Sequence, residues 1–348
     1  MKPQTTHQQQ QVFAPMGGFQ AVTESIAKLA QSRGVVIETG KTVTNIGPKG
    51  VHVISNSDNT SHVTTSFVQA DLVIVNADLP YASKSLVVEP SSANRVLIDP
   101  YKPRFDWDDS FLFSSGVVAF HWCINKELND LNTHNVFLAA ALGRAQAKES
   151  WRVLRVTEKT KEPPDSTGSV EPFNFYLHRA TATDPSAAPQ GCDSIMVLVP
   201  CPTLQRNPEY AKLSRDKAIE KYKEQFDQPE YLASLRQAVL ERLSTVESLA
   251  NLELHIVDEV IDTPATYADM YHVGAGTPFA LSHGFAQLSL TRPGPQYGWG
   301  KQKHHNPILY CGASSRPGNG VPLVLTGSKL VAQKAISVLK ELANRVDK

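Results

Sequence analysis

Apolar residues recur first at helical spacing and then at strand spacing over the opening part of the chain. Five of them share one helix face between residues 19 and 30: Phe19, Val22, Ile26, Leu29 and Ala30. Gly34 is suited to end this helix, because glycine readily adopts the left-handed conformation found just after helices. Short apolar runs then predict strands over 35–38, 42–46, 51–54 and 62–68, and the last two form a hairpin.

The next run, 72–75, is uniformly apolar, which is typical of a parallel strand covered on both faces. It delivers Asn76 and Asp78 to its carboxyl end, the edge at which open α/β sheets bind ligands. We therefore expect both side chains near a ligand. For Asp78, the N-cap of a helix over 79–86 is an equal alternative.

From residue 90 to residue 284 the pattern changes to strands with helices between them. Strands are predicted over 111–124, 134–140, 173–178 and 194–199, and helices between residues 210 and 250. The second helix carries an apolar stripe at spacings of three and four, formed by Leu232, Leu235, Val239, Leu243, Val246 and Leu249. The stripe favours a helix that covers the sheet over one that faces a membrane. Thr263 and Pro264 predict the start of a further short helix.

The stretch 308–332 predicts a strand, a glycine-rich turn and a helix. Gly312, Gly318 and Gly320 allow the backbone to turn tightly and to approach a ligand closely. Pro322 favours a helix start there. Two neighbouring faces of this helix, one with Val321, Leu325, Lys329 and Ala332 and one with Leu323, Thr326 and Leu330, are expected to pack on a sheet. Its free N–H groups suit an anion or an electron-rich ring carbonyl, although a tight connection without any ligand is the alternative.

The composition restricts the function. The 348 residues, 41% of them hydrophobic, allow two domains with real cores, and a net charge of zero removes the electrostatic attraction behind non-specific nucleic-acid binding. The glutamine-rich start over 1–14 is predicted to be disordered. We find neither a targeting signal nor a run of about 18 apolar residues, the length a transmembrane helix needs.

The cysteines and histidines do not indicate a metal site. Cys123, Cys192, Cys201 and Cys311 are widely spaced without a CxxC pair, and we expect buried, reduced thiols. The pair His304-His305 lacks a nearby carboxylate or cysteine and is expected in a solvated loop.

Several motifs resemble one family, and they occur in its order from about residue 15 to residue 335. The motifs are MGGF from Met16, ADLVIVNAD from Ala70, DPSAAPQG from Asp184, TPATYADMYHVGAG from Thr263, TRP from Thr291 and LYCGAS with PGNGVP around Gly312. Together they resemble the phytoene desaturases of the bacterial and fungal type, in the flavin-dependent carotenoid desaturase and isomerase group. Two polar, Pro/Gly-rich segments, 161–172 and 294–306, depart from that pattern and look like surface insertions.

The resemblance implies an α/β fold with an incomplete FAD-binding Rossmann-like domain and an α+β substrate domain, in which helices cover a β-sheet. The implied division is a start at 1–14, a partial FAD-binding domain at 15–89, a polyene-binding domain at 90–290, a polar loop at 291–307 and a C-terminal FAD-binding segment at 308–348.

The resemblance also implies a site with FAD as the cofactor and no metal. The implied cofactor-binding residues are Gly312, Ala313, Gly318, Gly320, Val321, Asn76 and Asp78. His283, Phe285 and Arg292 are candidates for lining the polyene, with core packing as the alternative for the first two and a structural salt bridge favoured for Arg292. No catalytic side chain is identified.

The implied reaction is desaturation of phytoene or a related polyene by hydride transfer to the flavin, with oxygen or a quinone as electron acceptor. Such a protein is expected at a membrane surface, in the plastid of a photosynthetic eukaryote and otherwise on the cytoplasmic face. A cis-trans carotenoid isomerase or polyene saturase is the alternative enzyme. A non-catalytic remnant that binds an apolar ligand or a partner is the alternative from another class.

One family element is missing from this sequence, the G-x-G-x-x-G unit that holds the FAD pyrophosphate. We favour a truncated chain over the loss of half a cofactor site. Strands 73–75 and 309–311 are then expected to lack neighbours, and the chain alone to be poorly stable.

Overall fold

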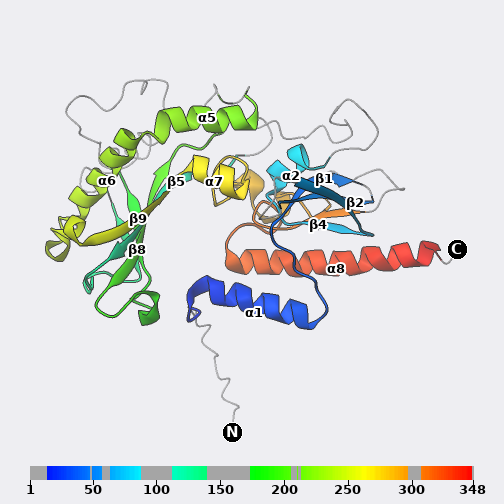
Figure 1. The fold of residues 1–348 in the computed structure, drawn as a ribbon, viewed down its shortest axis with the longest axis horizontal. Helices are drawn as coiled ribbons and strands as arrows, with labels where there is room; N and C mark the ends of the chain where they lie inside the picture. The colour runs from blue at the N-terminus through cyan, green and yellow to red at the C-terminus, as the bar shows by residue number, and fades with distance from the viewer. Residues whose placement is uncertain are drawn as a thin grey trace, which may run out of the picture.

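A computed structural model describes residues 14–47, 49–56, 63–87, 112–138, 173–204, 210, 213–296 and 307–346. Most of the glutamine-rich start, the insertion at 161–172 and the pair His304-His305 lie outside these residues. The chain forms a mixture of helices and sheets, with one larger sheet and two smaller ones (Figure 1).

The larger sheet is antiparallel and has the order β6-β7-β8-β5-β9. Its strands are β5 (Gly116–Ile124), β6 (His134–Phe137), β7 (Phe175–Arg179), β8 (Asp193–Cys201) and β9 (Ile256–Asp262). Along β8 every second residue is buried, among them Ile195, Val197 and Val199, because successive side chains of a strand point to opposite faces. The strand predicted from residue 111 begins only at Gly116, after a single bridge that joins Phe113 to Leu281.

Helix α6 (Pro229–Leu243) lies along this sheet, whereas α5 (Arg215–Phe226) crosses above its end and packs with α7 (Pro264–Tyr271) (Figure 1). Leu235, Val239 and Leu243 of α6 are buried in the same cluster as Trp122 of β5, so the predicted role of the stripe as a sheet cover is confirmed. Each such side chain contributes about 1.5–3 kcal/mol on burial. The apolar stripe extends beyond the C-terminal end of α6, since Leu249 lies in the 3₁₀ turn η4 (Glu247–Leu249).

Short elements follow this core. The 3₁₀ turn η5 (Leu252–His255) precedes β9, and η6 (Phe285–Gln287) and η7 (Ser289–Thr291) lie between α7 (Pro264–Tyr271) and β10. Thr263 caps α7 as predicted, because its hydroxyl accepts a hydrogen bond of 3.3 Å from the Thr266 amide.

The described residues form two smaller sheets besides the five-stranded one. Strands β1 (Lys41–Gly47), β2 (Gly50–Asn56) and β3 (Val63–Gln69) make an antiparallel meander, which confirms the predicted hairpin. Strand β4 (Val73–Val75) pairs in parallel with β10 (Ile308–Tyr310), and α2 (Leu79–Ser85) follows β4. The predicted strand 35–38 is wrong: Val36 is 82% exposed, and no described strand pairs with this segment.

The β4–β10 pair corrects two expectations. The two strands are neighbours of one another, so the expectation that each lacks a neighbour is wrong. The expectation that β4 is covered on both faces is also wrong, because Ile74 is 47% exposed while Val75 is buried. Uniform apolarity shows that a strand is suited to burial on both faces, but the described residues cover only one of them.

Two long helices complete the fold. Helix α1 (Gly18–Ser32) forms as predicted but buries none of its residues, and its apolar face is exposed at Phe19, Ile26 and Leu29. Helix α8 (Val321–Val346) is the longest. None of the helices in the described part of the chain is long and apolar enough to cross a bilayer.

Helix α8 packs through a different face from the one predicted. Its buried positions are Gly327, Val331, Ala335 and Val338, whereas Val321, Leu323 and Leu325 are exposed. At Gly327 a Cβ would lie 3.0 Å from the Arg316 carbonyl oxygen, so the absence of a side chain there lets the preceding turn approach the helix. Apolar spacing alone did not reveal this role of a small residue.

The cysteines carry free thiols, but Cys123 is exposed, so the expectation that all four are buried is wrong. Cys201 is fully buried, and desolvation raises the pKa of its thiol to about 12.

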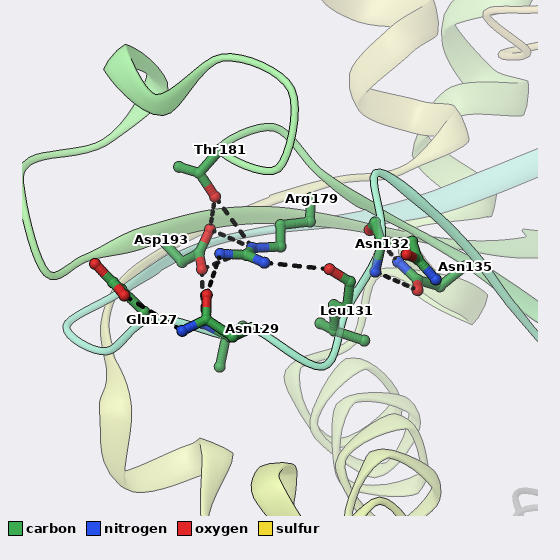
Figure 2. Close-up of polar contacts among 9 residues, drawn as sticks. Glu127, Asn129, Leu131, Asn132, Asn135, Arg179, Thr181 and Asp193 are labelled. Carbon is green, nitrogen blue, oxygen red and sulfur yellow. Dashed lines mark hydrogen bonds and ion pairs between the residues drawn. The ribbon is translucent and has the colours of Figure 1, made fainter.

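A buried polar network ties the loop after β5 to β7 and β8 (Figure 2). The Arg179 Nε donates to both carboxylate oxygens of Asp193, at 3.0 and 2.8 Å, and its Nη1 donates to the Leu131 carbonyl at 3.2 Å. The Asp193 carboxylate also accepts from the Thr181 hydroxyl and, at 2.8 Å, from the Leu128 amide. Both charged groups are therefore satisfied inside the fold.

We expect Arg179→Leu to lower the free energy of unfolding by about 3–5 kcal/mol, because it leaves the buried Asp193 carboxylate without its cation. Urea unfolding followed by circular dichroism measures this loss. Lys223→Met is the matched control: Lys223 pairs with Asp269 at 3.1 Å on the surface, and such pairs contribute at most about 1 kcal/mol. Equal losses in the two variants would contradict the prediction.

Candidate functional site

The carboxyl ends of β4 and β10 meet at one edge and bring predicted residues together. The Cys311 amide donates to the Val75 carbonyl at 3.0 Å and extends the parallel pairing by one step. The Asn76 Oδ1 accepts from the Cys311 thiol at 3.3 Å. Gly312 follows with a φ of 107°, and a Cβ there would lie 3.1 Å from the same Asn76 oxygen. A side chain at position 312 would therefore strain the backbone and crowd Asn76.

Asp78 joins three segments of the chain. It occupies the N-cap position of α2, but its side chain makes no capping bond. Instead, Oδ2 accepts from the Gly274 amide at 2.7 Å and Oδ1 accepts from the Ser314 hydroxyl. Burial raises the pKa of Asp78, and the two hydrogen bonds and the charges of Arg215 and Arg292 oppose that rise. The helix-cap alternative thus holds for the backbone position and not for the carboxylate.

Arg292 is fully buried and reaches the same turn from another segment. Its guanidinium donates to backbone carbonyls on both sides: at 2.7 Å to Leu281, at 3.0 Å to Ser282, at 3.2 Å to Gln287, and at 2.9 and 3.3 Å to Ala313. The favoured structural salt bridge is not what these contacts form, since carbonyls and not carboxylates take the donors. Burial lowers the pKa of Arg292, and the Asp78 charge opposes this effect.

The glycine-rich segment continues beyond Ala313, the residue that Arg292 binds. Gly318 has a φ of 148°, and a Cβ there would lie 2.7 Å from the Nε2 of His283. Gly320 has a φ of 92° with nothing within 4 Å of its Cβ position, so open space faces it. Val321 is exposed as the first residue of α8. Burial and the charge of Arg292 lower the pKa of His283.

The structure separates the three candidates for lining the polyene. The His283 ring lies beside Gly318, and Phe285 is 96% exposed. The Arg292 side chain has no exposed surface and is occupied by carbonyls, so it acts on the turn and not on a ligand.

Sequence reasoning did not single out several residues of this site. Ser314 and Ser315 are both almost fully buried; Ser314 binds Asp78, and the hydroxyl of Ser315 has no hydrogen-bond partner among the described residues. The signal available in the sequence was a pair of hydroxyl residues between Gly312 and a proline. The MGGF and DPSAAPQG motifs also meet, because the Gly17 amide donates to the Asp184 carboxylate at 2.7 Å.

The site is built mainly from backbone, glycine and buried anchors. Within the described residues no group of three or more His, Cys, Asp or Glu side chains could hold a metal ion. Such an edge is suited to binding a flat, electron-rich group against the backbone, while the group itself supplies the chemistry.

Part of the chain is similar to a known protein family. Residues 4–107 match the family described as flavin containing amine oxidoreductases. This match and the mixed helix and sheet architecture confirm the prediction of an α/β flavin oxidoreductase fold.

The particular relatives are carotenoid desaturases. Phytoene desaturase from Fusarium fujikuroi is 28% identical over 93% of this chain and 51% of its own length. The zeta-carotene-forming phytoene desaturase of Myxococcus xanthus is 26% identical, over 94% of this chain and 53% of its own length. The 4,4'-diapophytoene desaturase of Staphylococcus haemolyticus is 24% identical, over 91% and 54%. The resemblance to phytoene desaturases is confirmed.

The chain spans about half the length of the curated relatives it matches. Among solved structures, an oxidoreductase from Methanosarcina mazei aligns with a TM-score of 0.49 and 16% identity, over 92% of this chain and 55% of the other.

We expect Arg292→Met to lower the free energy of unfolding by about 3 kcal/mol or more, because hydrogen bonds to a charged group contribute about 1.5–3 kcal/mol each and several are lost together. Urea unfolding is the measurement, and Arg33→Met, at an exposed position after α1, is the control. A loss as small as that of the control would contradict the anchoring role.

The raised pKa of Asp78 predicts a pH dependence of stability. The folded chain holds this proton more tightly than the unfolded chain, so the contribution is fully present below pH 3.8 and is lost as the pH rises through the raised pKa. Asp78→Asn cannot ionise. Its free energy of unfolding minus that of the unaltered chain is expected to grow by about 1.4 kcal/mol per pH unit between the two pKa values and then level off. A difference that stays flat from pH 4 to pH 8 would refute the shift.

Proposed function

We propose that this protein is an FAD-dependent oxidoreductase of carotenoid biosynthesis that desaturates phytoene or a related polyene. The observation that carries the proposal is the meeting of Asn76 and Gly312 at the carboxyl edge of β4 and β10, where the glycine-rich segment that includes Gly318 and Gly320 begins. These residues lie in the motifs that resemble the desaturases, and the named functions of the relatives agree with it.

The residues present fit a flavin. Gly312 and Gly320 lie in the left-handed region, and the space beside Gly320 is open, so the backbone can approach a flat ring. The buried Ser315 hydroxyl has no partner among the described residues, although buried polar groups are normally hydrogen-bonded. The hydroxyl has almost no exposed surface, so a bound group with polar atoms would satisfy it only if the residues that cover it shift on binding.

In this proposal the turn 312–321 and Asn76 hold the FAD, and Arg292 holds the turn through the Ala313 carbonyl. A bound flavin would supply the two-electron oxidant for this reaction, taking up the hydride from an allylic carbon of the polyene while the proton of the neighbouring carbon would pass to solvent. The protein's own residues bind and orient both partners and exclude water.

The polyene is proposed to pass along the exposed apolar residues that flank the turn. Phe285, Leu288 and Leu290 are exposed over η6 and η7, and Val321 and Leu323 are exposed at the start of α8. His283 and Phe285 keep their proposed contact with the polyene.

The remaining proposals concern the surroundings of the reaction. A water-insoluble substrate requires access to a membrane surface, so we propose peripheral membrane association. A quinone or oxygen is the proposed electron acceptor.

Removing the unpaired hydroxyl of Ser315 is expected to raise stability without cofactor and to weaken flavin binding. In the chain without cofactor, Ser315→Ala is expected to raise the free energy of unfolding by about 1–3 kcal/mol, because an unpaired buried hydroxyl carries that penalty. In the presence of FAD the same variant is expected to retain less flavin after desalting, measured from the visible absorption band.

The matched control is Thr203→Val, which removes another buried, unpartnered hydroxyl. It is expected to raise stability without any change in flavin retention. A colourless unaltered chain would count against flavin binding by these residues. If flavin is retained, turnover of phytoene in liposomes is the direct test, and absence of product would leave flavin binding without the desaturase activity.

A further inference from the structure

The Asp78 carboxylate lies where three parts of the chain come closest to the glycine turn. Asp78 follows β4, Gly274 follows α7, and Ser314 follows β10. Its two oxygens are divided between the other two segments, with Gly274 bound at 2.7 Å by Oδ2 and Ser314 bound by Oδ1. Neither oxygen serves the helix that begins at Asp78.

We propose that Asp78 is a positioning residue, which fixes the flavin-binding turn 312–316 through Ser314 and Gly274 instead of touching the cofactor. This inference rests on the proposed function and assigns to Asp78 a different role from the cofactor contact expected from its motif. The position of the turn then depends on the loop after α7, in which Gly274 lies.

The fit around Gly274 supports this role. A Cβ at position 274 would lie 2.9 Å from the Asp78 Oδ2 and 2.8 Å from the Phe113 ring, so only glycine allows the carboxylate to rest against this backbone. The close fit fixes the carboxylate on one side, and the Ser314 hydroxyl then takes its position from it.

The contacts of Arg292 also fix the turn, at the residue before Ser314. Arg292 binds the Ala313 carbonyl at 2.9 Å, and Asp78 binds the Ser314 side chain, so two adjacent residues of the turn are held by side chains from two other segments. Arg215 of α5 adds a second positive charge that acts on Asp78. Burying a carboxyl group is costly unless it is hydrogen-bonded, and the bonds to Gly274 and Ser314 offset that cost in the arrangement described.

Hydrogen exchange in the cofactor-free chain tests the positioning directly. The Ser315 amide donates to the Gly312 carbonyl at 3.0 Å, and the Arg316 amide donates to the Pro293 carbonyl at 2.9 Å. We expect Asp78→Ala and Ser314→Ala each to speed exchange at these two amides by about tenfold or more, the equivalent of one lost hydrogen bond to a charged group.

Asp78→Asn is the conservative variant, and it is expected to restore slow exchange. Its amide oxygen accepts from Gly274 and its NH₂ group donates to the Ser314 hydroxyl. Asp184→Ala is the matched control, because Asp184 binds a backbone amide of another segment, that of Gly17, and is expected to leave the turn unchanged. If Asp78→Ala does not fold, Ser314→Ala decides the question. Unchanged exchange at residues 315 and 316 in Ser314→Ala would overturn the proposal.

Titration with FAD, followed by quenching of flavin fluorescence, gives the second readout. Asp78→Ala and Ser314→Ala are expected to raise the dissociation constant about tenfold, and Asp78→Asn to return it to within about threefold of the unaltered chain. Flavin affinity that stays unchanged in both alanine variants overturns the positioning role.

An unaltered chain that binds no FAD overturns the proposed function instead. The exchange data still decide in that case whether Asp78 fixes the turn.

Discussion

The parallel pairing of β4 with β10 is the constraint on which the candidate site depends. Each strand has only three residues, yet their register brings Val75 beside Tyr310 and so places Asn76, Asp78 and the turn after Cys311 at one edge. So short a pair contributes few backbone hydrogen bonds. The geometry of this edge is therefore maintained by side chains that arrive from elsewhere, above all Asp78 and Arg292.

The sequence pattern correctly predicted the elements whose buried face follows from the periodicity of their own residues. The alternation along β8 and the stripe of α6 predicted a sheet and its covering helix, since both periodicities report which face meets the core. The conformational preference for glycine at position 312 could also be predicted, because other residues are strained at such a positive φ. The motif order gave the flavin oxidoreductase class before any geometry was known.

Other features depend on partners that are distant in sequence, and no local pattern encodes them. The bond between Asp78 and Gly274 and the carbonyls chosen by Arg292 follow only from how the segments assemble. The packing face of α8 was mispredicted because glycine normally destabilises a helix and carries no apolar side chain. Here Gly327 is the position at which the Arg316 backbone approaches α8 closely. The segment 35–38 has strand-like composition but no described strand beside it, and composition alone does not supply a pairing partner.

The contacts of Arg292 have an evolutionary consequence. Its guanidinium recognises the backbone of Leu281, Ser282, Gln287 and Ala313, and every amino acid supplies the same carbonyl group. The anchor itself therefore places no requirement on those four side chains, although Leu281 is fixed by its core packing and Gln287 by its own hydrogen bonds to Leu112. A change of ligand could thus reshape the exposed surface around the turn while the contacts of Arg292 with the backbone preserve its path.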